Sequence, residues 1–203
     1  MWKDLGVTSS PPARRIGAEG SKTRAQLLDA AELLLLEEGY AAVTSRRVAA
    51  KAGLKPQLVH YYFRTMDDLF LEVFRRRAEE NVSRVERAVG AGGSLRALWQ
   101  LNADPRGTAF TIEFVALANH RKAIRAEIAR YAERFRAAQL EAVTTALEAR
   151  GITAEQLPPI VALVTMTGIS QVLALENALG VQTGHDTTIS FIEQTITRLD
   201  SSP

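Results

Sequence analysis

Apolar residues recur with the period of an α-helix along most of this chain. The stripe within residues 27–35 follows the i, i+3/i+4, i+7 spacing of a helix with one buried face. Ser21 or Thr23 can cap the start of this helix, and Gly39 stands at its end. No run rich in Val, Ile or Thr alternates with polar residues in the way that is typical of strands. The pattern therefore predicts an all-α fold.

Two short helices joined by a tight turn follow the first one. The earlier of them begins at Thr44, whose side-chain oxygen can cap its first turn, and extends to Gly53. The later one covers about residues 56–63, with Pro56 in its first turn, where a missing N–H group costs nothing. Two short helices around a tight turn are typical of the helix-turn-helix motif.

The rest of the chain predicts six more helices. Thr65 caps the first of them, because Thr65-Met66-Asp67-Asp68 nearly matches a capping box, with Asp in place of Glu or Gln. This helix continues to about residue 89. The others are expected at about 94–102, 106–119, 121–150, 155–179 and 185–199, separated by Gly and Pro. Residues 1–20 have no periodicity and are rich in Gly, Pro and Ser, which predicts a flexible N-terminal arm.

Composition narrows the possible functions. The chain has no cysteine, which excludes disulfides, thiolate metal sites and a cysteine nucleophile. No stretch approaches the roughly 20 uninterrupted apolar residues of a membrane span, and the start lacks a signal-peptide pattern. We therefore expect a cytoplasmic protein with no membrane partner. Metal-type spacings, nucleophile motifs and phosphate loops are also missing, so we expect neither an enzyme nor a bound cofactor or metal.

Charge is unevenly distributed along the chain. Up to Arg77 there are 13 Lys and Arg against 9 Asp and Glu, whereas the remainder carries 12 against 14. The basic excess matters only if the cations share one face. The run at residues 75–77 we interpret as a solvated helix face.

The helix at residues 56–63 carries chemistry suited to DNA. Val59 and Phe63 are four apart and can point inward together. An amide, an imidazole, a phenol and a guanidinium then occupy the opposite side: Gln57, His60, Tyr61 and Arg64. Such groups can bond base edges and phosphates. Hydroxyls and cations nearby can extend this surface: Thr44, Ser45, Arg46 and Lys55.

At this point the chain resembles the DNA-binding domain of the TetR family of bacterial transcription regulators. The similar segments are Thr44-Ser45-Arg46-Arg47-Val48-Ala49, Ala52-Gly53-Leu54 and Val59-His60-Tyr61-Tyr62-Phe63, together with the acidic start of the next helix. The resemblance covers roughly residues 22–75. It implies a three-helix DNA-binding head at residues 21–66, followed by a helical effector-binding and dimerisation domain at residues 67–203.

The resemblance also implies roles for individual residues of the head. Thr44, Ser45 and Tyr62 become phosphate contacts, and Arg46, Gln57 and His60 become base readers. The full DNA-facing set that we predict is Thr44, Ser45, Arg46, Lys55, Pro56, Gln57, His60, Tyr61, Tyr62, Arg64 and Thr65.

Two positions of the head depart from the family pattern. Met66 stands where a phosphate-anchoring Lys is usual, and Arg64 can supply that charge instead. His60 stands where Tyr is common, which would make DNA affinity mildly pH-dependent.

The C-terminal part offers candidates for an effector pocket. Large apolar residues and a few polar ones recur there at helical spacing, which suits either an ordinary core or a cavity. The candidates are Trp99, Phe110, Glu113, Phe114, Leu117, His120, Tyr131, Phe135 and Met166. In the TetR family the last two helices, here about 155–179 and 185–199, form the dimer interface. The first of these is apolar on nearly all sides, so an intramolecular core helix is the alternative.

Together these features predict a dimeric, ligand-responsive repressor that a small apolar effector releases from a near-palindromic operator. The alternative is a helical small-molecule-binding or adaptor protein that keeps the three-helix head only as a folding unit. An exposed face shared by Arg46, Gln57, His60 and Arg64 discriminates between the two.

Overall fold

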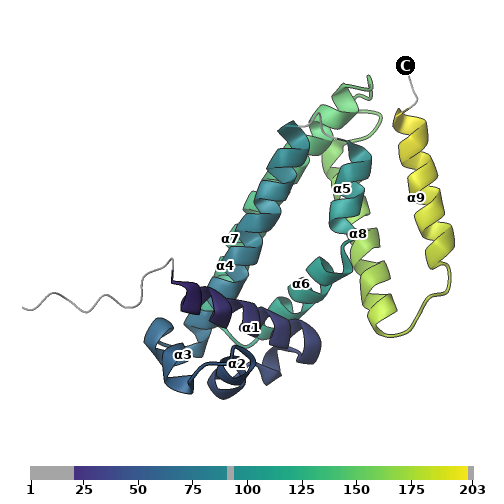
Figure 1. Cartoon of the computed structure of the whole chain (residues 1–203). Coiled ribbons are helices and arrows are strands. Elements are labelled where there is room, and N and C mark those ends of the chain that lie inside the picture. The colour runs from purple at the N-terminus through teal and green to yellow at the C-terminus, as the bar shows by residue number, and fades with distance from the viewer. Residues whose placement is uncertain (1–20, 91–93, 201–203) are drawn as a thin grey trace, which may run out of the picture.

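The structure, a computed structural model, describes residues 21–90 and 94–200 (Figure 1). Every regular element in these two ranges is a helix, so the all-α expectation is confirmed. The elements are α1 (Lys22–Glu38), the 3₁₀-helix η1 (Tyr40–Ala42), α2 (Ser45–Lys51), α3 (Pro56–Tyr62), α4 (Met66–Gly90), α5 (Leu95–Asn102), α6 (Pro105–Ala118), α7 (Lys122–Glu148), α8 (Pro159–Ala178) and α9 (His185–Asp200). The predicted N-terminal arm, residues 1–20, lies outside the described residues.

Side-chain caps fix the starts of the first helices. The Ser21 hydroxyl accepts from the Arg24 N–H group at 3.5 Å, and the Thr44 hydroxyl caps α2. At the start of α4 the Thr65 hydroxyl accepts from the Asp68 N–H group, and the Asp68 carboxylate accepts from the Thr65 N–H group. Each group satisfies a donor that the helix end leaves unpaired, so the predicted capping box is confirmed.

One predicted boundary is wrong by several residues. We expected a helix from about residue 155, but α8 begins at Pro159. Proline disfavours the helical conformation in the residue before it, and two consecutive prolines, Pro158 and Pro159, therefore delay the helix. Pro159 takes the first helical position, where its missing N–H group is tolerated.

Helices α1, α2 and α3 form a compact head around one apolar core. Leu27, Val48 and Val59, one from each helix, are completely or almost completely buried there. The turn between α2 and α3 passes through Gly53, whose φ of +67° is a conformation that other residues rarely adopt. The Leu54 N–H group closes this turn by donating to the Ala49 carbonyl at 2.8 Å. The sequence between the two helices thus fixes their relative orientation.

The long helices α4 and α7 lie side by side and connect the head to the rest of the molecule (Figure 1). A second apolar core lies beyond the head, where α5, α7 and α8 contribute Leu98, Leu147 and Leu163. Helix α9 stands apart from α8 over much of its length (Figure 1).

The arginines at residues 75–77 do not form the solvated face that we expected. Arg75 donates to Glu127 of α7 at 2.7 Å, and Arg76 donates to Asp29 of α1 at 2.6 Å. The expectation was wrong because the acidic partners lie on helices that meet α4 only in the folded chain. These ion pairs tie α4 to both the head and α7.

Candidate DNA-binding surface and effector cavity

The outer face of α3 is the exposed part of the head. Val59 and Phe63 point into the core, as their spacing predicts. The side chains on the other side of the helix are exposed, and Tyr61 keeps 52% of its surface. The structure therefore brings four predicted DNA-facing residues to one accessible surface: Gln57, His60, Tyr61 and Arg64.

Cations near this face differ in whether a carboxylate neutralises them. Arg47 is paired with Glu38 at 2.5 Å, and Lys51 is paired with Glu37 at 2.5 Å. The hydrogen bond from Arg47 also lowers the pKa of Glu38. Three other cations of α2, α3 and their flanks are exposed and have no ion pair to any described residue: Arg46, Lys55 and Arg64. These three are available to an external anion.

Two of the hydroxyl groups that we predicted to contact phosphates already make hydrogen bonds within the protein. Thr44 accepts from the Arg47 N–H group at 3.4 Å, which leaves its own O–H group free to donate outward. The Tyr62 hydroxyl bonds Ser21 at 2.8 Å, and its ring meets Tyr61 edge-on at 5.0 Å between centroids. Tyr62 therefore connects α3 to the start of α1.

The three remaining predicted positions border the same region. Ser45 is partly exposed in the first turn of α2, and Pro56 is exposed at the start of α3. Thr65 is exposed, although its hydroxyl already caps α4.

Helix α6 contacts the head through a carboxylate. Glu113 accepts a hydrogen bond from the Tyr40 N–H group at 2.7 Å. A Cβ atom on the preceding Gly39 would lie 3.3 Å from this carboxylate, and φ at Gly39 is +80°. Glycine is therefore required there both by the conformation and by the close approach. Glu113, which we predicted to face an effector, instead joins α6 to the turn after α1.

Other predicted pocket residues of this region also lie outside a cavity. Phe110, Phe114 and Leu117 are buried in the core that α1 and α4 share with α6. His120 is exposed in the turn before α7. Aromatic residues at helical spacing fill a core as readily as they line a pocket, so their spacing alone does not distinguish the two.

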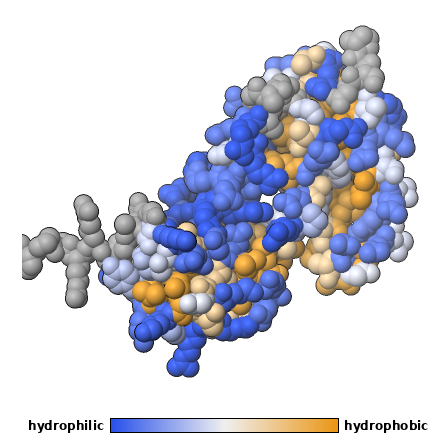
Figure 2. Space-filling view, in the orientation of Figure 1, coloured by the Kyte–Doolittle hydropathy of each residue, from blue (hydrophilic) through white to orange (hydrophobic). Residues whose placement is uncertain are grey.

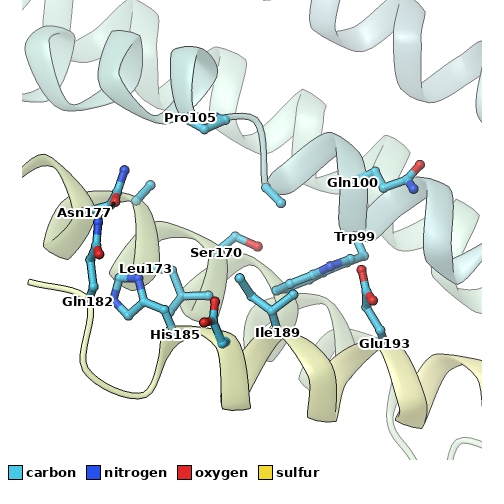
Figure 3. A pocket seen from close by; sticks show the side chains of 13 residues that line it. Trp99, Gln100, Pro105, Ser170, Leu173, Asn177, Gln182, His185, Ile189 and Glu193 are labelled. Atoms are coloured by element: carbon cyan, nitrogen blue, oxygen red, sulfur yellow. Dashed lines mark hydrogen bonds between the residues drawn. The ribbon is translucent and has the colours of Figure 1, made fainter.

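Trp99 borders a groove between α5, α8 and α9 of about 610 Å³ (Figure 3). Trp99 and Ile189 point toward one another across this groove, and Asn177 and Gln182 lie at its end near the α8–α9 loop (Figure 3). Close by, His185 bonds Glu176 at 2.9 Å and so links the start of α9 to α8. Met166 lies on a separate, smaller apolar cavity under α9.

Tyr131 and Phe135 line a third space, which we call the α4–α7 cavity. It has a volume of about 200 Å³ and is enclosed by α4, α7, the α5–α6 connection, α6 and α8. Phe74 supplies a third aromatic wall, with its ring 5.3 Å from that of Tyr131. The lining also contains three charged residues, Arg84, Asp104 and Arg136, and neutral polar side chains: Asn81, Asn102, Thr108, Thr111, Gln139, Thr167 and Gln171.

The sequence pattern could indicate only those residues of the α4–α7 cavity that lie on α7. Gln139 follows Tyr131 and Phe135 at intervals of four, so all three lie on one face of α7. A buried glutamine on an otherwise apolar face is unusual and marks the cavity. Asn81 and Thr167 come from α4 and α8, and no local pattern connects them with α7.

Helix α8 has more exposed apolar surface than a core helix should. By length and composition it could cross a membrane, and only 17% of its most apolar window is buried. The sequence expectation concerned uninterrupted apolar runs, and Gln171 and Glu176 interrupt the run in α8. By length and mean hydropathy, however, this helix still reaches the range of a membrane span. One such helix is weak evidence for membrane insertion. Figure 2 shows hydrophobic residues at the surface in the region of α8 and α9, where the exposed apolar residues are Ile160, Val161, Val164, Val172, Leu175, Leu179, Val181, Ile189 and Phe191.

Comparisons with known proteins agree with this architecture. Residues 27–73 match the family model of bacterial regulatory proteins of the tetR family. No curated protein matches the sequence. Similar folds occur in solved structures, although all those described below are at most 20% identical to the chain and so speak for the fold alone.

A putative TetR-family transcriptional regulator from Rhodococcus sp. aligns with a TM-score of 0.69 and 20% identity, over 89% of this chain and all of that one. A putative regulator from Saccharomonospora viridis, solved in complex with choline, aligns with a TM-score of 0.68 and 18% identity over 79% and 87% of the two chains. The fatty acid degradation regulator FadR from Bacillus halodurans aligns with a TM-score of 0.62 and 16% identity over 79% and 89%. Residues 27–73 therefore carry the DNA-binding head of bacterial regulatory proteins of the tetR family, and the chain as a whole shares its fold with solved TetR-family regulators.

Proposed function

We propose that the protein is a dimeric transcriptional repressor that leaves its operator when a small molecule binds in the helical body. The head, residues 21–66, binds DNA in this proposal, and residues 67–203 bind the effector and the second protomer. The sequence favoured an apolar effector, but the polar side chains of the α4–α7 cavity favour a compound with hydrogen-bonding groups.

The proposal rests on one observation: several exposed cations of the head have no carboxylate partner among the described residues. Arg46, Lys55 and Arg64 are exposed without carboxylate partners in the part of the chain that the structure describes, on the same head as the exposed Gln57 and His60. A DNA-binding surface needs unpaired cations, because phosphate contacts supply most of the affinity. Gln57 and His60 then supply base contacts in the major groove.

The exposed apolar face of α8 and α9 supports the dimer. The buried residues of α8 are Leu163, Met166 and Ser170, and exposed apolar residues lie along the rest of the helix. Contiguous apolar surface of this kind typically marks an interface. A two-fold pair of these helices forms a four-helix contact that buries the surface. The same dimer carries two copies of α3, which can enter successive major grooves about 34–36 Å apart.

Selection of bound fragments from random DNA tests the proposal directly. We expect the purified protein to select a near-palindromic sequence. Gln57→Ala should lose discrimination at one base position of each half-site, by about 1–3 kcal/mol, because a base contact is removed. Thr44→Ala should weaken binding to all sequences alike, since a phosphate contact carries no sequence information.

Matched variants separate this function from the adaptor alternative. Arg46→Gln removes an unpaired cation and should weaken DNA binding, whereas Lys51→Gln removes a cation that Glu37 already neutralises. If no DNA sequence is enriched, and if Gln57→Ala and Thr44→Ala bind DNA as the parent does, the head has no DNA-reading role and the adaptor function is favoured.

A further inference from the structure

We propose that the effector is a single-ring compound with a carbonyl or carboxylate oxygen, which accepts a hydrogen bond from the Tyr131 hydroxyl inside the α4–α7 cavity. This inference rests on the proposed function, because it names the ligand class of the proposed effector site. It concerns the cavity bordered by Phe74, Tyr131 and Phe135 and not the open groove beside Trp99.

The size and walls of the cavity select a small ring. An apolar cavity of about 150 Å³ is known to accept benzene, so a space of about 200 Å³ suits one ring with a short substituent. The Tyr131 ring stacks on Phe135 at 5.7 Å and meets Phe74 edge-on at 5.3 Å. Aromatic walls in these orientations offer both faces and edges to a further ring.

Among the cavity-lining residues that the structure describes, Tyr131 has a buried side-chain oxygen without a well-formed hydrogen bond. The Asn81 side chain lies close enough to act on this hydroxyl as a hydrogen-bond partner. Burial raises the pKa of Tyr131 to about 12, against a smaller opposite effect of Asn81, so the hydroxyl keeps its proton at neutral pH. A buried donor without an acceptor costs free energy, and a ligand oxygen placed against it recovers that cost. The cavity therefore requires an acceptor from its ligand.

Neighbouring polar groups are already committed to one another. Gln139 donates to the Asn102 side-chain oxygen at 3.1 Å, and Asn102 donates to the Leu98 carbonyl at 2.9 Å. Thr108 donates to the Asp104 carbonyl at 3.4 Å. These bonds hold one side of the cavity in place, and the Tyr131 hydroxyl is the buried donor of the described lining that they leave for a ligand.

The charges at the cavity disfavour a cationic ligand. Asp104 is the single carboxylate among the described lining residues, and it lies 3.6 Å from Arg77 and 3.7 Å from Arg84. Arg136, also in the lining, is exposed and makes no ion pair to a described residue. The charged residues of the described lining are thus Arg84, Arg136 and Asp104, and their net charge is positive. A neutral carbonyl or a carboxylate is therefore accepted, whereas a quaternary ammonium group meets no free anion.

Four ring compounds of similar size test the inference on the full chain without DNA. Acetophenone and benzoate carry an acceptor oxygen, toluene carries none, and benzyltrimethylammonium is a cation. Isothermal titration calorimetry should give tighter binding for the two oxygen compounds than for toluene, and the weakest binding for the cation. Tyr131→Phe should weaken acetophenone binding about fivefold to tenfold, the usual value of one hydrogen bond, and leave toluene binding unchanged.

A matched variant and a stability measurement control for folding. Tyr40→Phe removes a phenol hydroxyl in the head and should leave all four affinities unchanged. Tyr131→Phe should not lower the melting temperature, because removing a buried hydroxyl without a well-formed hydrogen bond leaves nothing unsatisfied.

Some outcomes overturn the ligand class, and others concern only the proposed function. Equal binding of toluene and acetophenone, no effect of Tyr131→Phe on their ratio, preferred binding of the cation, or no saturable binding of any compound would each overturn the ligand class. The titrations contain no DNA, so they succeed or fail independently of operator recognition. Acetophenone binding that depends on Tyr131, in a protein that selects no DNA sequence, would refute the repressor and leave the ligand class standing.

Discussion

The unpaired cations of the head make a quantitative prediction about the salt dependence of DNA binding. Each protomer presents Arg46, Lys55 and Arg64 without intramolecular partners among the residues described, so the proposed dimer presents six such charges. If all six meet phosphates, the log–log slope of affinity against salt is about −5.4, at about −0.9 per neutralised phosphate. Lys55→Gln removes two contacts from the dimer, so the slope becomes about −3.6.

These slopes differ enough to be measured easily. Between about 0.1 and 0.3 M salt, the parent protein should lose about 400-fold in affinity and the Lys55→Gln variant only about 50-fold. Fluorescence anisotropy of a labelled duplex at several KCl concentrations gives both values. Any duplex serves for this assay, since the electrostatic part of binding does not depend on sequence.

Lys51→Gln is the matched control, because the same change is made four residues away on a cation that Glu37 already pairs at 2.5 Å. Its slope should stay close to that of the parent. The reasoning would be refuted if Lys51→Gln and Lys55→Gln changed the slope equally, since pairing within the protein would then not decide which cations meet DNA.

Three further predictions concern the body of the protein. Phe114→Ala should lower the unfolding free energy by about 3–5 kcal/mol in urea denaturation, because Phe114 is 0% exposed, whereas Val115→Ala at 49% exposure should stay within about 0.5 kcal/mol. Arg75 lowers the pKa of Glu127 below its ordinary 4.5, so Glu127→Gln should cost stability at neutral pH. In urea titrations this difference should disappear as the pH falls through the lowered pKa, and a pH-independent difference would exclude the ion pair as its cause. Val172→Asp should convert the dimer to monomers in light scattering, since it places a charge on the exposed apolar face of α8; an intact dimer would exclude this interface.

Local patterns were sufficient to predict the fold and the head. Helical periodicity and helix caps depend on residues only a few positions apart. The sequence therefore predicts where α1, α2 and α4 begin, at the caps Ser21, Thr44 and Thr65. The outward face of α3 followed from one buried pair, Val59 and Phe63, because a helix fixes the direction of every other side chain. The sequence could not show which cations are unpaired, since Lys51 finds its carboxylate on another helix.

The sequence could not separate core residues from cavity residues in the body of the protein, for a related physical reason. Phe110 and Phe114 have the same spacing and chemistry as Tyr131 and Phe135, yet the first pair fills the core and the second pair lines a cavity. The difference arises from the helices that pack against them, and no local pattern records that packing. Gln139, a buried amide on the face of α7 that carries Tyr131 and Phe135, is the better indicator of the cavity, because a polar group needs a partner when it is buried.

Helix α6 provides the physical connection between the two proposed sites. Thr108 and Thr111 of α6 line the α4–α7 cavity, and Glu113, one half-turn further on, bonds the Tyr40 N–H group of the head. Arg121, just beyond α6, pairs with Asp67 at the start of α4 and lies over the Phe70 ring. A ligand that favours a different position of α6 must therefore also act on the head through the part-buried contact between the Glu113 carboxylate and the Tyr40 N–H group. By linkage, DNA that holds the head in place must weaken ligand binding by the same factor.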